Sequence, residues 1–295
     1  MTALLESQQQ RKSFERGELE MTALLESQQQ RKSFEQGEVK MTALLESQQL
    51  CKSFVLGNDN EYTVLSDVDL SIEPGEFVSV MGPSGSGKST LLYNISGMDR
   101  AKSGRVLFNG QDITALSEEE LSKVRLTGMG FVFQHIHLLK NLSIFDNVVL
   151  PAYLAREESH DQIDQRAEAV MEQVRIAHLA DNDITQASGG QLQRVGICRA
   201  LINNPEILFG DEPTGALNSK AASEIMDLLA DINESGTTIM LVTHDVRVAA
   251  RTERVLFMLD GQIVAEKHLG KPSANGTERK EREESLSSWL TELGF

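Results

Sequence analysis

Short apolar runs separated by polar and glycine-rich stretches make up most of this chain. Glu76–Met81 and Ile207–Gly210 are apolar runs of the length expected for buried strands. Gly130–Phe133 and Thr237–Thr243 have the same pattern, and Ser89–Met98 continues the first run as a helix. Membrane spans need roughly 18 consecutive apolar residues, far more than any of these runs offers. The pattern predicts buried strands that end in polar loops.

The first sixty residues contain three copies of a twenty-residue unit that opens Met-Thr-Ala-Leu-Leu-Glu-Ser-Gln-Gln. The third copy has Leu50-Cys51 and Val55 where the other two have Gln-Arg and Glu, which lets this copy enter a core. We therefore expect residues 1–40 to be a duplicated, weakly ordered tail, because polar residues dominate them. The alternative is a short amphipathic helix that carries their leucines and phenylalanines to a partner or a membrane surface.

Composition and charge limit the class of partner. The chain has 295 residues, of which 40% are hydrophobic and 24% charged, as in ordinary globular proteins. Its formal net charge of −16 argues against nucleic acid as a ligand, because a phosphate backbone needs a basic face. The two cysteines, Cys51 and Cys198, have no metal-binding spacing, and the N-terminus lacks the layout of a signal peptide. We expect a soluble protein of the reducing cytoplasm.

A phosphate-binding loop is predicted directly after the first strand. Gly82, Gly87, Lys88 and Ser89 match the pattern Gly, four residues, Gly-Lys-Ser/Thr. Glycines let the backbone wrap a phosphate chain, while the helix N-terminus and the lysine add positive charge. The serine hydroxyl is then the expected Mg²⁺ ligand. The predicted nucleotide-binding residues of this loop are Gly82, Pro83, Ser84, Gly85, Ser86, Gly87, Lys88, Ser89 and Thr90.

Two carboxylates, Asp211 and Glu212, end the predicted strand that begins at Ile207. An aspartate at a strand end beside a phosphate loop can hold Mg²⁺ through water. The adjacent glutamate can polarise an attacking water molecule as a general base. This pair therefore predicts nucleotide hydrolysis rather than nucleotide binding alone.

A second anion site is predicted at Ser188-Gly189-Gly190-Gln191, at the start of the helical stretch Leu192–Leu201. With this segment the chain resembles the ATP-binding cassette (ABC) ATPases, whose signature reads Leu-Ser-Gly-Gly-Gln. The resemblance covers about Leu44–Gly270. It implies an α/β fold, a P-loop NTPase with a RecA-like core, an antiparallel β subdomain and an inserted α-helical subdomain. It also assigns Ser188, Gly189, Gly190 and Gln191 to ATP.

The same resemblance assigns further roles, with ATP and Mg²⁺ as the ligands. Gln134 is implied to contact Mg²⁺ or the attacking water, and His244 the γ-phosphate. The catalytic set is thus Glu212, His244 and Gln134, and the Mg²⁺ ligands are Ser89, Gln134 and Asp211. Phe54 is the residue expected to stack on adenine, with Tyr62 as the alternative.

Members of this family form head-to-tail homodimers in which each ATP lies between the phosphate loop of one copy and the signature of the other. ATP binding would then join the two copies and hydrolysis would release them. Two positions depart from the family pattern. Ala187 replaces the leucine of the signature, and Asn218 replaces the usual aspartate of the segment Gly215–Ser219, called the D-loop. The amide keeps hydrogen-bonding capacity but loses the charge, which puts coupling across the dimer in question.

Three parts are expected along the chain. Residues 1–40 are the tail, and 41–270 are the nucleotide-binding domain, with its helical subdomain at about 135–195. Residues 271–295 form a linker and a short C-terminal helix over Ser285–Leu293. That helix is expected to dock on its own domain; the alternative is a contact with a permease or with the second copy.

Two stretches, Gly75–Thr90 and Asp211–Leu217, resemble those of the ATPases of lipoprotein release, macrolide export and antimicrobial-peptide resistance. This implies a separate membrane permease partner, FtsX-like or similar, and a location at the inner face of the cell membrane. The apolar segment His135–Val148 is where relatives receive the permease's coupling helix. Two alternatives stay open: a cell-division ATPase that signals through a permease-like partner, and a soluble ABC ATPase without a transport function.

Overall fold

A six-stranded, mostly parallel sheet forms the centre of the chain from residue 43 onward. The computed structural model describes residues 43–56, 60–272 and 277–295. In spatial order the strands of this sheet are β10 (Gln262–His268), β9 (Arg254–Leu259), β3 (Phe77–Met81), β8 (Thr238–Val242), β7 (Ile207–Asp211) and β6 (Met129–Phe133). Five of them run parallel, and only β10 is antiparallel to its neighbour. Strands β3 and β8 are buried over their whole length, as their unbroken apolar runs predict.

The parallel order decides where the motifs meet. The phosphate loop follows β3, Gln134 follows β6, Glu212 follows β7 and His244 lies just beyond β8. Parallel strands end at the same edge of a sheet, and ligands of open α/β sheets bind at that edge. Four segments that are far apart in the sequence are therefore gathered at one edge.

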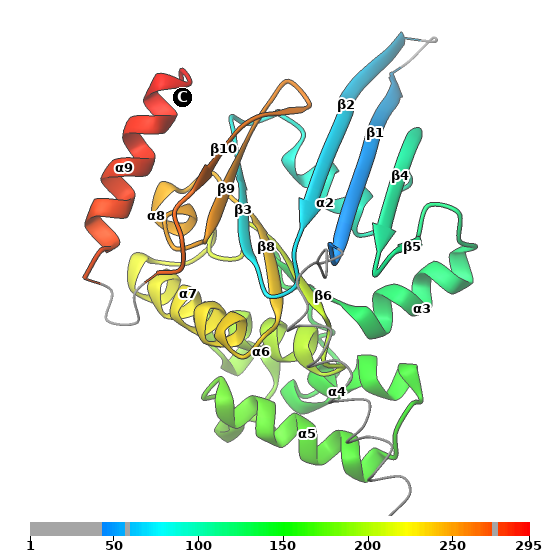
Figure 1. Cartoon of the computed structure of the whole chain (residues 1–295). Coiled ribbons are helices and arrows are strands. Elements are labelled where there is room, and N and C mark those ends of the chain that lie inside the picture. The colour runs from blue at the N-terminus through cyan, green and yellow to red at the C-terminus, as the bar shows by residue number, and fades with distance from the viewer. Residues whose placement is uncertain (1–42, 57–59, 273–276) are drawn as a thin grey trace, which may run out of the picture. The chain divides into compact units, whose positions relative to one another are not determined.

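A second, antiparallel sheet lies beside the first (Figure 1). Its strands, in spatial order, are β2 (Asn60–Ile72), β1 (Leu45–Leu56), β4 (Ser103–Phe108) and β5 (Gln111–Asp112). Strand β1 lies within the third copy of the repeat. Leu50, one of the residues that distinguish this copy, has no exposed surface. The tail expected over residues 1–40 lies outside the described residues.

The helices connect and cover the sheets. They are α2 (Lys88–Ile95), α3 (Glu118–Gly128), α4 (Ile144–Ala155), α5 (His160–Gln173), α6 (Gly189–Leu201), α7 (Ser219–Glu234), α8 (Val246–Ala249) and α9 (Arg279–Glu292), with two short 3₁₀ turns, η1 (Ala177–Leu179) and η2 (Ile184–Gln186). Helices α4 and α5 pack against each other and against α6, forming the lower group in Figure 1. This group, inserted between β6 and β7, is the helical part of an α/β fold of the kind the resemblance implies.

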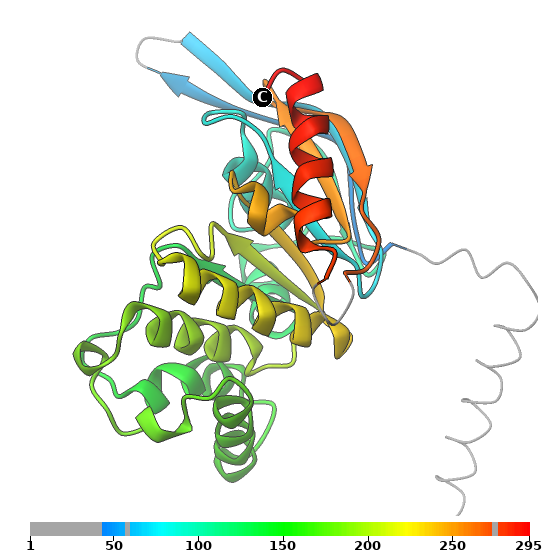
Figure 2. The same cartoon turned by 90° about the vertical axis from the view of Figure 1, so that its left-hand side faces the viewer.

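The C-terminal helix docks on the sheet domain rather than projecting from it (Figure 2). Leu286 and Leu290 are buried in one cluster with Met81 and Phe257, and the ring of Trp289 lies edge-on to that of Phe257. This cluster explains the apolar spacing at the end of the sequence. It also ties α9 to the last residue of β3, immediately before the phosphate loop.

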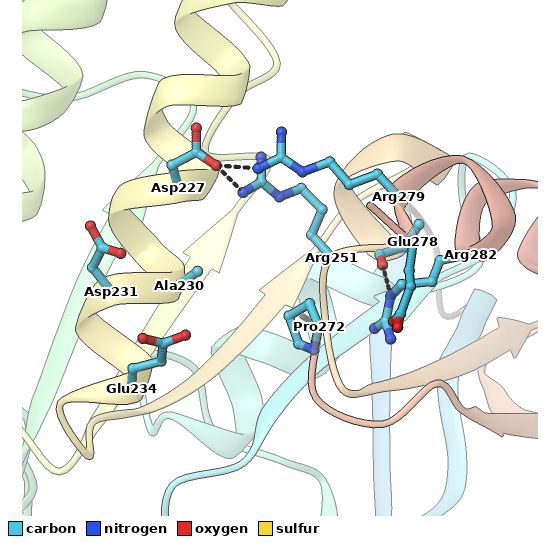
Figure 3. Close-up of a pocket in the computed structure, with 10 residues that line it drawn as sticks. Asp227, Ala230, Asp231, Glu234, Arg251, Pro272, Glu278, Arg279 and Arg282 are labelled. Atoms are coloured by element: carbon cyan, nitrogen blue, oxygen red, sulfur yellow. Dashed lines mark hydrogen bonds and ion pairs between the residues drawn. The ribbon is translucent and has the colours of Figure 1, made fainter. Parts of the chain in front are cut away.

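Arginine side chains hold the beginning of α9 in place (Figure 3). Asp227 of α7 accepts hydrogen bonds from Arg251 and, at 2.7 Å, from Arg279. The buried Arg282 donates to four backbone carbonyls in the segment 250–270. These residues line a cavity of about 130 Å³ between α7 and α9.

Candidate functional site

The phosphate loop has a backbone that only glycine fits at two points. Gly82 has φ 151°, and a Cβ there would lie 2.0 Å from the carbonyl oxygen of Met258. Gly87 has φ 98°, and its Cβ would lie 2.8 Å from the carbonyl oxygen of Val64. The backbone of β9 and that of β2 therefore lie so close to the loop that a side chain at Gly82 or Gly87 would displace the loop. The helix α2 begins at the next residue, Lys88, so its N-terminus faces the loop.

Lys88 is folded back over the loop. Its ammonium group donates to the carbonyls of Gly82 and Pro83, both at 2.8 Å, and the side chain is buried. Burial lowers the pKa of Lys88, while the carboxylates of Glu212 and Asp211 act in the opposite direction. The Lys88 side chain is thus held against the loop by two neutral carbonyl acceptors that a phosphate could replace.

Asp211, the last residue of β7, is held by two side chains of α2. Ser89 donates to its Oδ1 at 2.9 Å, and the Tyr93 hydroxyl donates to its Oδ2 at 2.8 Å. Burial, the larger cause, and the hydrogen bond to Asp211, the smaller one, raise the pKa of Tyr93 to about 12, so the hydroxyl stays protonated. No motif in the sequence includes Tyr93. Its spacing of four residues from Ser89, one turn along the predicted helix, was the only available signal.

The oxygen donors at this point suit Mg²⁺. Mg²⁺ prefers hard oxygen ligands and is usually bound by one or two carboxylates together with substrate phosphates. Ser89 and Asp211 supply a hydroxyl and a carboxylate side by side. Within the described ranges, no group of three or more His, Cys, Asp or Glu side chains could hold a metal by itself. The donor set therefore fits a cation that arrives with a nucleotide.

Glu212 and His244 are joined across the ends of the adjacent strands β7 and β8. The Glu212 carboxylate lies 2.7 Å from His244 Nδ1 and accepts the backbone N–H of His244 at 3.1 Å. Thr243 donates its hydroxyl to the other carboxylate oxygen at 3.3 Å. Glu212 itself has φ 49°, a left-handed conformation that costs energy for a residue with a side chain. This strained turn lets the carboxylate reach the neighbouring strand end.

Gln134 is brought to the same edge by β6. Its backbone N–H donates to the carbonyl of Asp211 at 2.9 Å, and its side chain is exposed. A Cβ at Gly215 would lie 3.0 Å from the Gln134 amide nitrogen, so the glutamine side chain lies against the D-loop. Gln134, Asp211 and the D-loop are therefore neighbours, whereas the predicted cation contact of Gln134 stays a prediction.

The signature segment makes its contacts at the start of α6 and near the D-loop. Ser188 is the N-cap of α6, and the Gln191 side chain accepts the Ser188 backbone N–H at 2.8 Å, which completes a capping box. The nearest side-chain atoms to the Cβ positions of Gly189 and Gly190 belong to Leu217 and Ala221. In the part of the chain that the structure describes, no hydrogen bond joins this segment to the phosphate loop. Within the described residues, each of the two predicted anion sites therefore makes its own local hydrogen bonds and none to the other.

The two aromatic candidates for the base lie opposite each other in the β1–β2 hairpin. Phe54 pairs with Tyr62 in the strand register, and their exposed fractions are 43% and 58%. The Lys52 ammonium lies 5.0 Å from the centre of the Phe54 ring, a cation–π contact. Both rings are accessible, so the preference for Phe54 over Tyr62 stays a prediction.

Comparisons with known proteins identify relatives of this chain. A family model described as ABC transporter matches residues 65–215. The macrolide export ATP-binding/permease protein MacB of Pasteurella multocida is 42% identical over 208 residues, which are 70% of this chain and 32% of that protein. The pyoverdine export ATP-binding/permease protein PvdT of Pseudomonas fluorescens is 42% identical over 217 residues, 74% of this chain and 33% of that protein.

A solved structure is similar as well. The ATP-binding cassette MJ0796, in a dimeric post-hydrolysis state bound to ADP and Pi, aligns with a TM-score of 0.71 and 39% identity, over 76% of this chain and 98% of that one. The chain spans about a third of the length of the two export proteins. Across residues 43–56, 60–272 and 277–295, no helix has both the length and the apolar character needed to cross a membrane.

Proposed function

The chain belongs to the ABC transporter family, and on that premise we propose that it binds and hydrolyses ATP to drive a membrane permease in an export system. One observation carries the proposal: a single sheet edge gathers the phosphate loop, Gln134, the Asp211-Glu212 pair and His244. Phosphate-binding and acid–base groups are thereby within reach of one nucleotide.

Each group has a chemical role in this proposal. The loop amides and Lys88 bind the phosphates. Glu212 accepts a proton from the attacking water. His244, whose Nδ1 lies 2.7 Å from the Glu212 carboxylate, orients that carboxylate and contacts the γ-phosphate. Ser89, Asp211 and Gln134 would hold Mg²⁺, which supplies neutralisation of phosphate charge when bound. Phe54 stacks on the adenine.

The central test is Glu212→Gln. Glutamine keeps the size and hydrogen bonds of the side chain but cannot take up the proton, so phosphate release should fall at least about a hundredfold. ATP binding should persist, and the variant should accumulate as an ATP-dependent dimer in size-exclusion chromatography with light scattering.

The matched control is Glu206→Gln, which removes a carboxylate next to the opposite end of β7. It should hydrolyse ATP at the parent rate. If Glu212→Gln also does so, Glu212 is not the general base.

A homodimer completes the proposed site. The signature segment Ser188–Gln191 makes no hydrogen bond to the phosphate loop of its own copy among the described residues, and its two glycines lie nearest to Leu217 and Ala221. In the head-to-tail dimer of the family the segment would close over the ATP held by the second copy. Exposure of this segment in the single chain supports that arrangement, because Ser188 and Gly189 are both open to solvent.

A groove beside β6, lined by residues on either side of the expected segment His135–Val148 but by none within it, is the proposed permease contact. It is lined by apolar side chains of β6 and α4, among them Phe131 and Leu154, and by Met98 after α2, and its volume is about 560 Å³. Leu154 and Met98 are 61% and 41% exposed, an apolar surface between the sheet domain and the helical group. We propose that a coupling segment of an FtsX-like or similar permease occupies it, which holds the protein at the cytoplasmic face of the membrane.

Leu154→Glu tests this contact. A charge in the apolar groove should leave the ATPase rate of the isolated chain unchanged. It should abolish the stimulation of that rate by the permease, and the variant should no longer co-purify with the permease from membranes. Val264→Glu is the matched control, because Val264 is 49% exposed on β10, at the opposite edge of the sheet. Equal co-purification of both variants would place the permease contact elsewhere.

A further inference from the structure

Tyr93 contacts the candidate metal-binding carboxylate but belongs to none of the motifs. Its hydroxyl donates to Asp211 Oδ2 at 2.8 Å while Ser89 donates to Oδ1 at 2.9 Å. The two donors are four residues apart on α2 and so lie on one face of that helix, one turn apart. A single helix thus holds both oxygens of one carboxylate.

The position of the Tyr93 hydroxyl is set by the core. The ring packs against the buried cluster that includes Leu92, Phe209 and Met240, so only the hydroxyl reaches out to the strand end. A hydrogen bond to an ionised carboxylate is stronger than one between neutral groups, which makes this contact a firm constraint on the rotation of Asp211.

Ser89 alone is a poor anchor for Asp211. Its hydroxyl has a second task in the proposed function, as a cation ligand, whereas the Tyr93 hydroxyl has a single acceptor among the described residues. We propose that Tyr93 is a positioning residue that fixes the Asp211 carboxylate for the divalent cation of the bound nucleotide. This inference rests on the proposed ATPase function. Partners of ligating or water-bridged carboxylates typically change metal affinity when they are removed.

The test uses the full chain with Mn²⁺ as a spectroscopic probe. Tyr93→Phe removes only the hydroxyl and keeps the packed ring. Mn²⁺ titrated into the complex of the protein with ADP, and followed by electron paramagnetic resonance, should bind roughly tenfold more weakly to Tyr93→Phe than to the parent. The affinity for ADP measured in EDTA should be the same for both.

Tyr153→Phe is the matched control. Tyr153 donates to Asp164 at 2.5 Å within the helical group, so this variant also loses a tyrosine–aspartate hydrogen bond, but away from the nucleotide site. Its Mn²⁺ affinity should equal that of the parent.

Three results would overturn the inference: unchanged Mn²⁺ affinity in Tyr93→Phe, tighter Mn²⁺ binding, or an equal loss of ADP affinity in EDTA, which indicates a general loss of structure. Failure of the parent chain itself to bind ADP would instead contradict the proposed function. The two failures are therefore distinguishable.

Discussion

Individual side chains in this protein act by joining segments that are remote in the sequence. Asp211 is bonded by Ser89 and Tyr93, more than a hundred residues earlier, and Glu212 by His244 on the next strand. Each contact pairs a carboxylate with a hydroxyl or an imidazole, and these hydrogen bonds fix the two carboxylates at the strand ends. At this scale the structure also gives Asn218 a role: its side chain accepts the backbone N–H of Ala221 at 3.0 Å and caps α7.

Substitutions of Asn218 should follow this capping role. Asn218→Asp keeps the cap and adds a negative charge at a helix N-terminus, so the free energy of unfolding should rise by about 0.5 kcal/mol. Asn218→Ala loses the cap and should lower the free energy of unfolding by about 1 kcal/mol. Urea unfolding followed by circular dichroism measures both. A lower stability for Asn218→Asp than for Asn218→Ala would show that repulsion from nearby carboxylates outweighs capping.

Among the elements, the parallel strands and the C-terminal helix have different tasks. Strands β3, β6, β7 and β8 bring the chemical groups to one edge. Helix α9 instead supports the strand that leads into the phosphate loop, through Leu286 and its contacts with Met81 and Phe257. The apolar spacing at the end of the chain therefore serves packing within its own domain.

Leu286→Ala measures that support. Leu286 has no exposed surface, so truncation should lower the free energy of unfolding by about 2–5 kcal/mol, from lost burial and the cavity left behind. Ser287→Ala, one residue along on the exposed face of α9, should change it by less than about 0.5 kcal/mol. Thermal and urea unfolding provide the comparison. Equal stabilities would mean that α9 contributes little to the domain.

For the whole molecule, one described copy holds two candidate half-sites that share no hydrogen bond. The phosphate loop and the signature make their contacts in different parts of the copy, at the sheet edge and at the D-loop region. A head-to-tail dimer is the simplest way to bring both to one ATP, because its two-fold symmetry forms two equal sites at once.

Mixing two inactive variants tests this symmetry. Lys88→Ala should abolish ATPase activity by losing phosphate binding, and Ser188→Arg by blocking the signature. In a mixed dimer both changes fall in the same site, so the other site carries neither, and the mixture should regain partial activity. Phosphate release from each variant alone and from the mixture decides the matter. A mixture as inactive as its components would contradict sites shared between copies.

Much of the site could be predicted because it is local in sequence. The phosphate loop, the Asp211-Glu212 pair and the capping segment Ser188–Gln191 are runs of adjacent residues whose types alone limit the backbone and the chemistry. The predicted strands appear within a residue or two of their expected bounds, because unbroken apolar runs bury well in a parallel sheet. The helix predicted at Leu192 begins earlier, at Gly189, since its cap is Ser188 itself.

The sequence by itself determined the family and the candidate residues for nucleotide chemistry, because short motifs depend on local spacing. The tertiary structure decided what those residues touch. The contact of Tyr93 with Asp211 and that of Glu212 with His244 both depend on the spatial order β3-β8-β7-β6, which differs from the order along the chain. Spacing in the sequence does not encode that order; the packing of buried strands selects it.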